Sequence, residues 1–277
     1  MRATRRSGAR RARPSRSWAP TRAVGAGRVW PRPNAACTHP EATVTLILTA
    51  HGSVDPRSAA VTRAVAGRIR RLRPWLHVEA AFLEKTAPSL ADVLARTSDD
   101  PVVVPFLLAD AYHARSDIPA VIEASNRPVR QAGVLGEDPA LLAVARHRLA
   151  EAGVSPDDEE LGVLVVAVGS SRAAANARTA TVASALSAGT RWVGADTGFA
   201  TGPYANLAGA AEGLRARGAR RVVLAPWFLA HGRITDRVAE FAAAQGFRLA
   251  EPLGSHNLVA ATVLDRFDAA TAALAAA

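Results

Sequence analysis

The sequence contains the same arrangement of short apolar runs twice, and this repetition limits the possible folds more than any other feature. Three segments recur at nearly constant offsets of 117, about 121 and 118 residues: 44–53 recurs as 161–170, 102–109 as 222–230, and 135–138 as 253–256. A nearly constant offset over three segments indicates a tandem duplication. We therefore expect two similar lobes that face each other, with a candidate site in the cleft between them.

Within the first repeat, short β-branched runs alternate with longer amphipathic segments, which is typical of a parallel sheet covered by helices. We expect strands at residues 44–50, 76–83, 101–108 and 129–134. We expect helices at residues 56–72, 89–95, 117–124 and 139–152, of which the first and last are capped by an aspartate that precedes a proline. The predicted fold class is α/β, with two tandem-duplicated lobes that each hold a four-stranded, mainly parallel sheet flanked by helices.

Positive charge is concentrated in residues 1–42. This segment holds ten arginines and one acidic residue, and it is rich in Pro, Gly, Ala and Ser without helical or strand periodicity. From residue 43 onward, 24 basic residues face 23 acidic ones, so all but one unit of the net charge of +10 comes from the tail. We predict a disordered basic tail over 1–42, a lobe over 43–152, a linker over 153–160 and a second lobe over 161–277. An organellar presequence and an overextended start are alternative explanations of the tail.

Several functional classes lack their sequence signals. The single cysteine, Cys37, lies in the tail, so no disulfide or thiolate metal site can form within one chain. No apolar run approaches the roughly 18 residues that would span a bilayer, and none follows Arg5-Arg6 as an export signal requires. No glycine-rich phosphate loop follows a strand. These features predict a cytoplasmic protein that binds neither nucleic acid nor membrane and uses no nucleotide.

Three polar side chains follow neighbouring strands of the predicted first lobe. His51 ends the apolar run 45–50, Glu84 follows the second strand, and His113 lies just past the third. The carboxyl ends of parallel strands meet at one edge of a sheet, so we expect these side chains to converge. Two imidazoles and a carboxylate without cysteine suit a borderline divalent ion such as Fe, Co or Ni.

Structural roles compete with this interpretation. His51 can be incidental to a strand-to-helix turn, and His113 can cap the helix near Asp117. Glu84 can cap the helix near Ser89 or pair with Lys85.

The duplication favours a chemical role for His51. The glycine and serine that follow it recur at 169 and 170, whereas Val168 replaces the histidine. We expect four other histidines to be structural or solvated: His77, His147, His231 and His256. Of these, His231 is the first candidate for an exception, because it also follows a strand.

Residues 45–268 resemble the sirohydrochlorin chelatase family in its two-lobed long form. The resemblance is carried by three motifs in order: His51-Gly52-Ser53 with Asp55-Pro56-Arg57, then Ala81-Phe82-Leu83-Glu84, then 103–108 followed by Tyr112-His113 and Asp117-Ile118-Pro119. This family inserts cobalt or iron into a tetrapyrrole in cobalamin and siroheme synthesis. The resemblance implies two chelatase-like lobes and a lyase, the alternative being a non-catalytic carrier of a metal or tetrapyrrole.

Carried over by position, the resemblance implies His51, Glu84 and His113 as catalytic residues, with the two histidines as metal ligands. They would deliver the ion and accept the pyrrole protons, while Glu84 orients an imidazole or relays a proton. The substrates would be sirohydrochlorin and Co²⁺, Fe²⁺ or Ni²⁺, with no further cofactor. Candidate contacts to the substrate and its carboxylates are Gly52, Ser53, Arg57, Tyr112, Arg115, Arg172, Arg233 and Arg237. Residues 229–237 depart from the family pattern, with His231 where proline is common.

Overall fold

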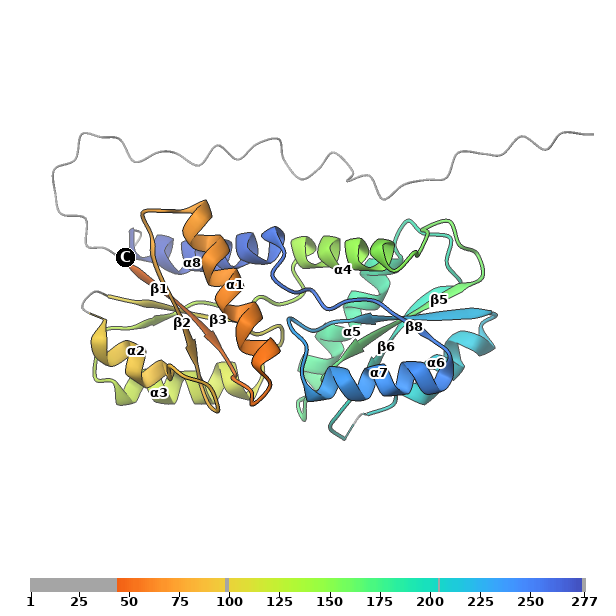
Figure 1. Cartoon of the computed structure of the whole chain (residues 1–277), viewed down its shortest axis with the longest axis horizontal. Helices are drawn as coiled ribbons and strands as arrows, with labels where there is room; N and C mark the ends of the chain where they lie inside the picture. Colours follow the sequence, from red (N-terminus) through yellow and green to blue (C-terminus); the bar gives the residue numbers. More distant parts are fainter. Residues whose placement is uncertain (1–43, 98–99, 204, 276–277) are drawn as a thin grey trace, which may run out of the picture.

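The computed structural model describes residues 44–97, 100–203 and 205–275. The predicted basic tail and Cys37 lie outside the described residues. Two four-stranded parallel sheets form the centres of two lobes that lie side by side, as Figure 1 shows. The strand orders are β2-β1-β3-β4 and β6-β5-β7-β8, which are the same topology twice. The predicted α/β class with two duplicated lobes is confirmed.

The elements of the first repeat follow the predicted order. Its strands are β1 (Thr45–Ala50), β2 (His77–Phe82), β3 (Val102–Pro105) and β4 (Arg130–Gln131). Its helical segments are α1 (Pro56–Leu72), α2 (Leu90–Arg96), the π-helical turn η1 (His113–Asp117), α3 (Ile118–Ala124) and α4 (Pro139–Glu151). Strands β3 and β4 are shorter than expected. After Phe106 donates a last backbone hydrogen bond to Thr49 (2.7 Å), the chain leaves the sheet toward η1.

The second repeat has the same sequence of elements without a π-helical turn. Its strands are β5 (Leu161–Ala167), β6 (Gly194–Phe199), β7 (Arg221–Pro226) and β8 (Arg248–Leu249). Its helices are α5 (Ala173–Ser187), α6 (Leu207–Ala216), α7 (Arg233–Gln245) and α8 (Asn257–Ala275). Strands β1 and β5 are buried along their whole length, because each lies between two other strands and is covered on both faces.

The helix caps are local consequences of the sequence. Asp55 accepts a hydrogen bond from the backbone N–H of Arg57 (2.9 Å) and Asp138 accepts one from Ala140 (2.8 Å). Each aspartate stands just before a proline, which fixes the backbone of the first turn without losing a needed donor. The two predicted caps are therefore confirmed.

The last helix of each repeat crosses to the other lobe. Helix α4 packs against α5 and β7 of the second sheet, while α8 packs against α1 and β3 of the first (Figure 1). The crossing of α8 is supported by a two-fold hydrogen bond from Arg73 to Asp268 (2.6 and 2.5 Å) and by Arg266, which donates to Asp138 (2.9 Å). Buried residues of both lobes consequently form one continuous apolar cluster. Since the lobes share this core, the cleft between them is held by packing and not only by the linker.

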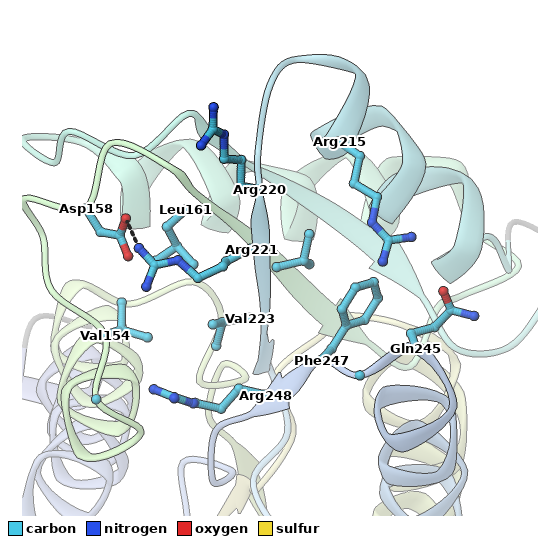
Figure 2. Close-up of a pocket in the computed structure, with 13 residues that line it drawn as sticks. Val154, Asp158, Leu161, Arg215, Arg220, Arg221, Val223, Gln245, Phe247 and Arg248 are labelled. Atoms are coloured by element: carbon cyan, nitrogen blue, oxygen red, sulfur yellow. Dashed lines mark hydrogen bonds and ion pairs between the residues drawn. The ribbon is translucent and has the colours of Figure 1, made fainter.

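The linker is fastened at the amino-terminal edge of the second sheet, beside a cavity of ≈ 270 Å³ (Figure 2). Arg221 donates to Asp158 (2.7 Å), and Arg248 donates to the backbone carbonyl of Ala152 (2.7 Å). The guanidinium of Arg215 lies over the ring of Phe247 at 4.8 Å. These arginines stand at the opposite end of the strands from the predicted site, and two of them hold the chain that joins the repeats.

Candidate functional site

The two predicted histidines meet at the carboxyl-terminal edge of the first sheet. His51 is the first residue after β1, and His113 opens η1 after β3 leaves the sheet. Their ring centroids are 4.2 Å apart at an interplanar angle of 40°. The side chains are 41% and 42% exposed, so both imidazoles reach solvent and a ligand can approach them. The expected convergence of the two rings is present.

Glu84 completes the predicted trio. Its Oε1 lies 2.8 Å from Nε2 of His51 and 3.0 Å from Nζ of Lys85. The hydrogen bond with Lys85 is the main reason that the pKa of Glu84 is lowered, so this carboxyl is ionised at neutral pH. Of the two alternative structural roles for Glu84, the pairing with Lys85 is present. The capping role is wrong, because the helix at Ser89 begins with a capping box formed with Asp92.

The backbone holds His51 and Glu84 in register. The N–H of Glu84 donates to the carbonyl of His51 (3.0 Å), directly beside Gly52, whose φ is +90°. A Cβ on Gly52 would overlap the carbonyl oxygen of Glu84. Glycine is needed here both for the left-handed backbone and for this close approach.

Asp117 is a site residue that the sequence reasoning assigned to a helix start. Its Oδ2 lies 2.5 Å from Nδ1 of His113, and the two residues are the ends of η1. A carboxylate at Nδ1 holds the proton on that nitrogen and leaves the lone pair on Nε2 free for a metal or a proton. π-Helical turns are often found at functional sites. The i,i+4 spacing of His and Asp is the signal that could have identified the pair.

The environment keeps His51 uncharged. Burial and, next, the neighbouring His113 lower its pKa below the ordinary value of 6.5, while Glu84 acts in the opposite direction. The Nδ1 atom of His51 is shielded from solvent and has no hydrogen-bond partner.

The site offers fewer protein ligands than a site that holds a metal ion permanently. Among the residues that the structure describes, no group of three or more His, Cys, Asp and Glu side chains is arranged to hold a metal ion. Two imidazoles with one carboxylate beside them leave coordination positions open. Such a site suits an ion that is received and passed on.

His51 lines two adjoining cavities of ≈ 410 and ≈ 510 Å³ between the lobes, and His113 lines the larger of them. Both cavities are lined by His51 and by apolar residues of the two lobes, namely Phe106, Leu107, Val168, Phe228, Leu229 and Ile234. The combined space is wide, apolar and open to solvent, which suits a flat ligand larger than a metal ion.

Among its described residues, the second lobe has no counterpart of the polar trio. The backbone N–H of Thr201 donates to the carbonyl of Val168, just as that of Glu84 donates to the carbonyl of His51. Thr201 and Val168 therefore occupy the positions of Glu84 and His51. The bond from Trp227 to Val166 corresponds to that from Phe106 to Thr49, so Ile234, seven residues after Trp227, occupies the position of His113. The polar trio therefore stands on the first lobe, opposite Val168 and Ile234 of the second.

The other predicted contacts differ in their availability. Gly52 and Ser53 line the smaller cavity, but the backbone N–H of Ser53 already donates to Thr86 (3.1 Å). Tyr112 is 63% exposed, lines the larger cavity and meets the ring of His113 edge-on at 6.0 Å. Arg115 is paired with Asp110.

The remaining candidate arginines are also divided. Arg57 is paired with Asp55 and Asp236. Arg233 lines the smaller cavity. Arg172 precedes α5 and lies close enough to Asp110 to lower the pKa of that carboxyl, although Arg115 contributes most of the shift.

The four other histidines of the described residues lie outside the trio. His77 is exposed at the start of β2, and His147 pairs with Glu151 at 3.1 Å. His256 lies 5.7 Å from His147 between ring centroids. His231 lines the smaller cavity and pairs with a carboxylate of the second lobe at 2.8 Å.

Comparison with known proteins adds a family match. The family model described as CbiX matches residues 45–152 and again residues 162–270. A sirohydrochlorin cobaltochelatase of Priestia megaterium is 25% identical over 210 residues, which cover 71% of this chain and 67% of the relative. A sirohydrochlorin cobaltochelatase of Methanopyrus kandleri is 30% identical over 83 residues, which cover 28% of this chain and 58% of the relative.

Solved structures share the fold. SirB from Bacillus subtilis with Fe³⁺ superposes with a TM-score of 0.67 at 20% identity, covering 82% of this chain and 94% of SirB. CbiX, described as the terminal enzyme for siroheme biosynthesis in denitrifying bacteria, gives a TM-score of 0.60 at 23% identity, covering 82% and 99%. At these identities the likeness establishes the two-lobed architecture.

The fold and the site together define a two-lobed α/β protein of chelatase type, with one imidazole and carboxylate site in the cleft between duplicated lobes. Because the family model matches both repeats, the assignment extends over most of the chain. The chain belongs to the CbiX family.

Proposed function

We propose that this protein is a lyase of the chelatase type that inserts Co²⁺ or Fe²⁺ into sirohydrochlorin. The observation that carries the proposal is the pair of imidazoles 4.2 Å apart at the wall of a wide inter-lobe cavity. Membership of the CbiX family and the cobaltochelatase relatives support the same reaction and substrates. The metal enters as a substrate, and no nucleotide or resident cofactor is required.

Insertion replaces two pyrrole protons of the macrocycle by one divalent ion, so the reaction releases two protons. His51 and His113 are the groups that bind the incoming ion and accept these protons, because the imidazole side chain is suited both to ligating a divalent ion and to accepting a proton. Asp117 holds the proton of His113 on Nδ1, and Glu84 holds His51 through Nε2. The anionic partners also stabilise an imidazole that has taken up a proton.

The cavity provides the surface for the macrocycle. Val168 and Ile234 on the second lobe face the side occupied by the histidines on the first. A flat ring between these walls buries its apolar faces, while its carboxylates extend toward the rim, where Arg233 stands. The polar chemistry on one wall means that the ion is delivered from one face of the ring.

The assignment is tested by comparing His113→Ala with His77→Ala, a control histidine at the opposite end of the sheet. We expect His113→Ala to lower kcat for cobalt insertion about 10²- to 10⁴-fold, while His77→Ala stays within about twofold of the unmodified protein. Visible absorbance of sirohydrochlorin follows the reaction, and circular dichroism verifies the fold. Full activity of folded His113→Ala would remove this histidine from the mechanism.

The same assay separates a catalyst from a carrier. A chelatase converts many equivalents of sirohydrochlorin per chain, whereas a carrier stops at one.

Among the described residues no helix is long and apolar enough to cross a membrane. We propose that the reaction takes place in the cytoplasm, with residues 43–152 supplying the chemistry and 161–277 the opposite wall of the cleft.

A further inference from the structure

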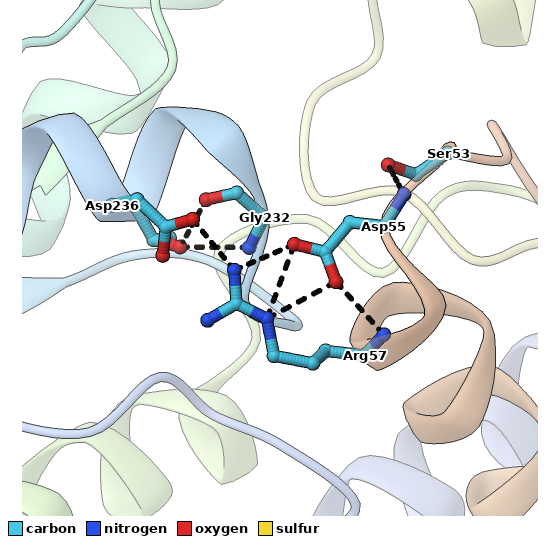
Figure 3. A network of polar contacts seen from close by, with 6 residues as sticks. Ser53, Asp55, Arg57, Gly232 and Asp236 are labelled. Atoms are coloured by element: carbon cyan, nitrogen blue, oxygen red, sulfur yellow. Dashed lines mark hydrogen bonds and ion pairs between the residues drawn. The ribbon is translucent and has the colours of Figure 1, made fainter.

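Arg57 joins the two lobes through carboxylates on either side, as Figure 3 shows. Its Nε and Nη2 donate to both oxygens of Asp55 at 2.6–3.1 Å, within the first turn of α1. The same Nη2 donates to Oδ2 of Asp236 on α7, 179 residues further along the chain, at 2.6 Å. One guanidinium thus contacts the start of a helix in each lobe: α1, which follows β1, and α7, which follows β7.

The contact stands at the rim of the smaller inter-lobe cavity. Ser53, Val54 and Ser58 line that cavity on the first lobe, and these residues flank Arg57 in the sequence. Gly232 and Thr235 line it on the second lobe, next to Asp236. The Arg57–Asp236 pair therefore stands beside lining residues of this cavity on both lobes.

The two partners of Arg57 are held with different firmness. Asp55 is 12% exposed, caps α1, and has its pKa lowered to about 2, chiefly by the side-chain hydrogen bond with Arg57. Asp236 is 48% exposed and contacts Arg57 through a single nitrogen. An exposed ion pair of this kind is weak, so the Asp236 contact exchanges easily while Asp55 keeps the guanidinium in place.

We propose that Asp236 is a stand-in for a carboxylate of the macrocycle, and that Arg57 exchanges Asp236 for that carboxylate when the substrate enters the cleft. This inference rests on the proposed function, because it takes a tetrapyrrole polycarboxylate as the ligand. Asp55 orients Arg57 toward the rim in both states. Asp236 weakens binding, since the incoming carboxylate must displace it.

The exchange is tested by equilibrium binding of sirohydrochlorin without metal to the full chain and to Asp236→Asn. Removing the competing charge is expected to lower the Kd about two- to fivefold. Arg57→Gln is expected to raise the Kd. In the Arg57→Gln background no guanidinium remains to be released. The fold-decrease in Kd that Asp236→Asn causes there should therefore be less than half of the fold-decrease that it causes in the unmodified protein. Asp196→Asn, from the exposed Arg217–Asp196 pair away from both cavities, is the matched control.

Two results would overturn the exchange. If Asp236→Asn raises the Kd, the pair is a clasp that the bound state needs. If Asp236→Asn lowers the Kd equally with and without Arg57, simple repulsion by Asp236 explains the effect. Turnover is measured separately: tight binding without metal insertion in the unmodified protein would refute the proposed function and leave the exchange intact.

Discussion

Replacing Gly52 by alanine tests how tightly the backbone sets the distance between His51 and Glu84. The glycine has a φ of +90°, and a Cβ added there would overlap the Glu84 carbonyl oxygen and lie 2.9 Å from its carbon. The added Cβ would lie 1.8 Å from that oxygen and ordinary contact begins at 3.4 Å, so the Glu84 backbone must move by about 1.6 Å. This shift strains its hydrogen bond to His51 and moves the carboxylate away from the imidazole.

The cost follows from these two effects. A left-handed conformation costs a non-glycine residue about 1–2 kcal/mol, and the weakened hydrogen bond adds about 1 kcal/mol. We expect Gly52→Ala to lower the free energy of unfolding by about 3 kcal/mol, which for a chain of this size is a fall in Tm of about 6–12 °C. Because a misplacement of about 1 Å in a site can cost about 10²-fold, kcat for metal insertion should fall by that factor.

The second repeat supplies a matched control for this change. Gly169 has a φ of +93°, and its Cβ would meet the carbonyl oxygen of Thr201, but no residue of the polar trio is adjacent. We expect Gly169→Ala to lower Tm by a similar amount while kcat stays within about threefold. Thermal unfolding by circular dichroism and initial rates below the Tm of each variant provide the two measurements. An equal loss of kcat in both variants would refute the reasoning.

Two further predictions concern the imidazoles. Asp117→Asn should weaken Co²⁺ binding about 10- to 100-fold, measured by calorimetry, because it removes the charge that orients His113. Glu123→Gln on the exposed face of α3 is the control. Equal Co²⁺ affinities in both variants would contradict the role of Asp117. The positive charge of Lys85 helps to lower the pKa of His51, so NMR titration of the metal-free protein should give a His51 pKa below 6.5 that rises in Lys85→Met. The neutral, ligand-competent imidazole then persists to lower pH in the unmodified protein than in the variant, and a pKa that falls in Lys85→Met would contradict this account.

Short-range patterns accounted for much of the fold and for the location of the chemistry. A strand and the residue that follows it are set by local hydrophobicity and glycine placement, so His51 and His113 could be assigned to one sheet edge. The helix caps at Asp55 and Asp138 are likewise local hydrogen bonds that the sequence spacing predicts. The duplication indicated that the polar trio stands on the first lobe, because Val168 stands where the first repeat has histidine.

Errors and omissions occurred where contacts between distant segments decide the structure. The third strand is shorter than its apolar run, since the chain must leave the sheet to place His113 over His51. Glu84 contacts His51 and Lys85 instead of capping α2, which already has its own capping box. Hydrophobicity alone does not distinguish these arrangements.

By itself, the sequence determined a duplicated α/β architecture and the strand ends that carry imidazole and carboxylate. Only the tertiary structure decided that α4 and α8 exchange lobes, that Asp117 holds His113, and that Arg57 spans the cleft to Asp236. The physical reason is range. Strand, helix and cap propensities depend on neighbours a few residues away, whereas these contacts depend on how two complete lobes pack their apolar surfaces into one core.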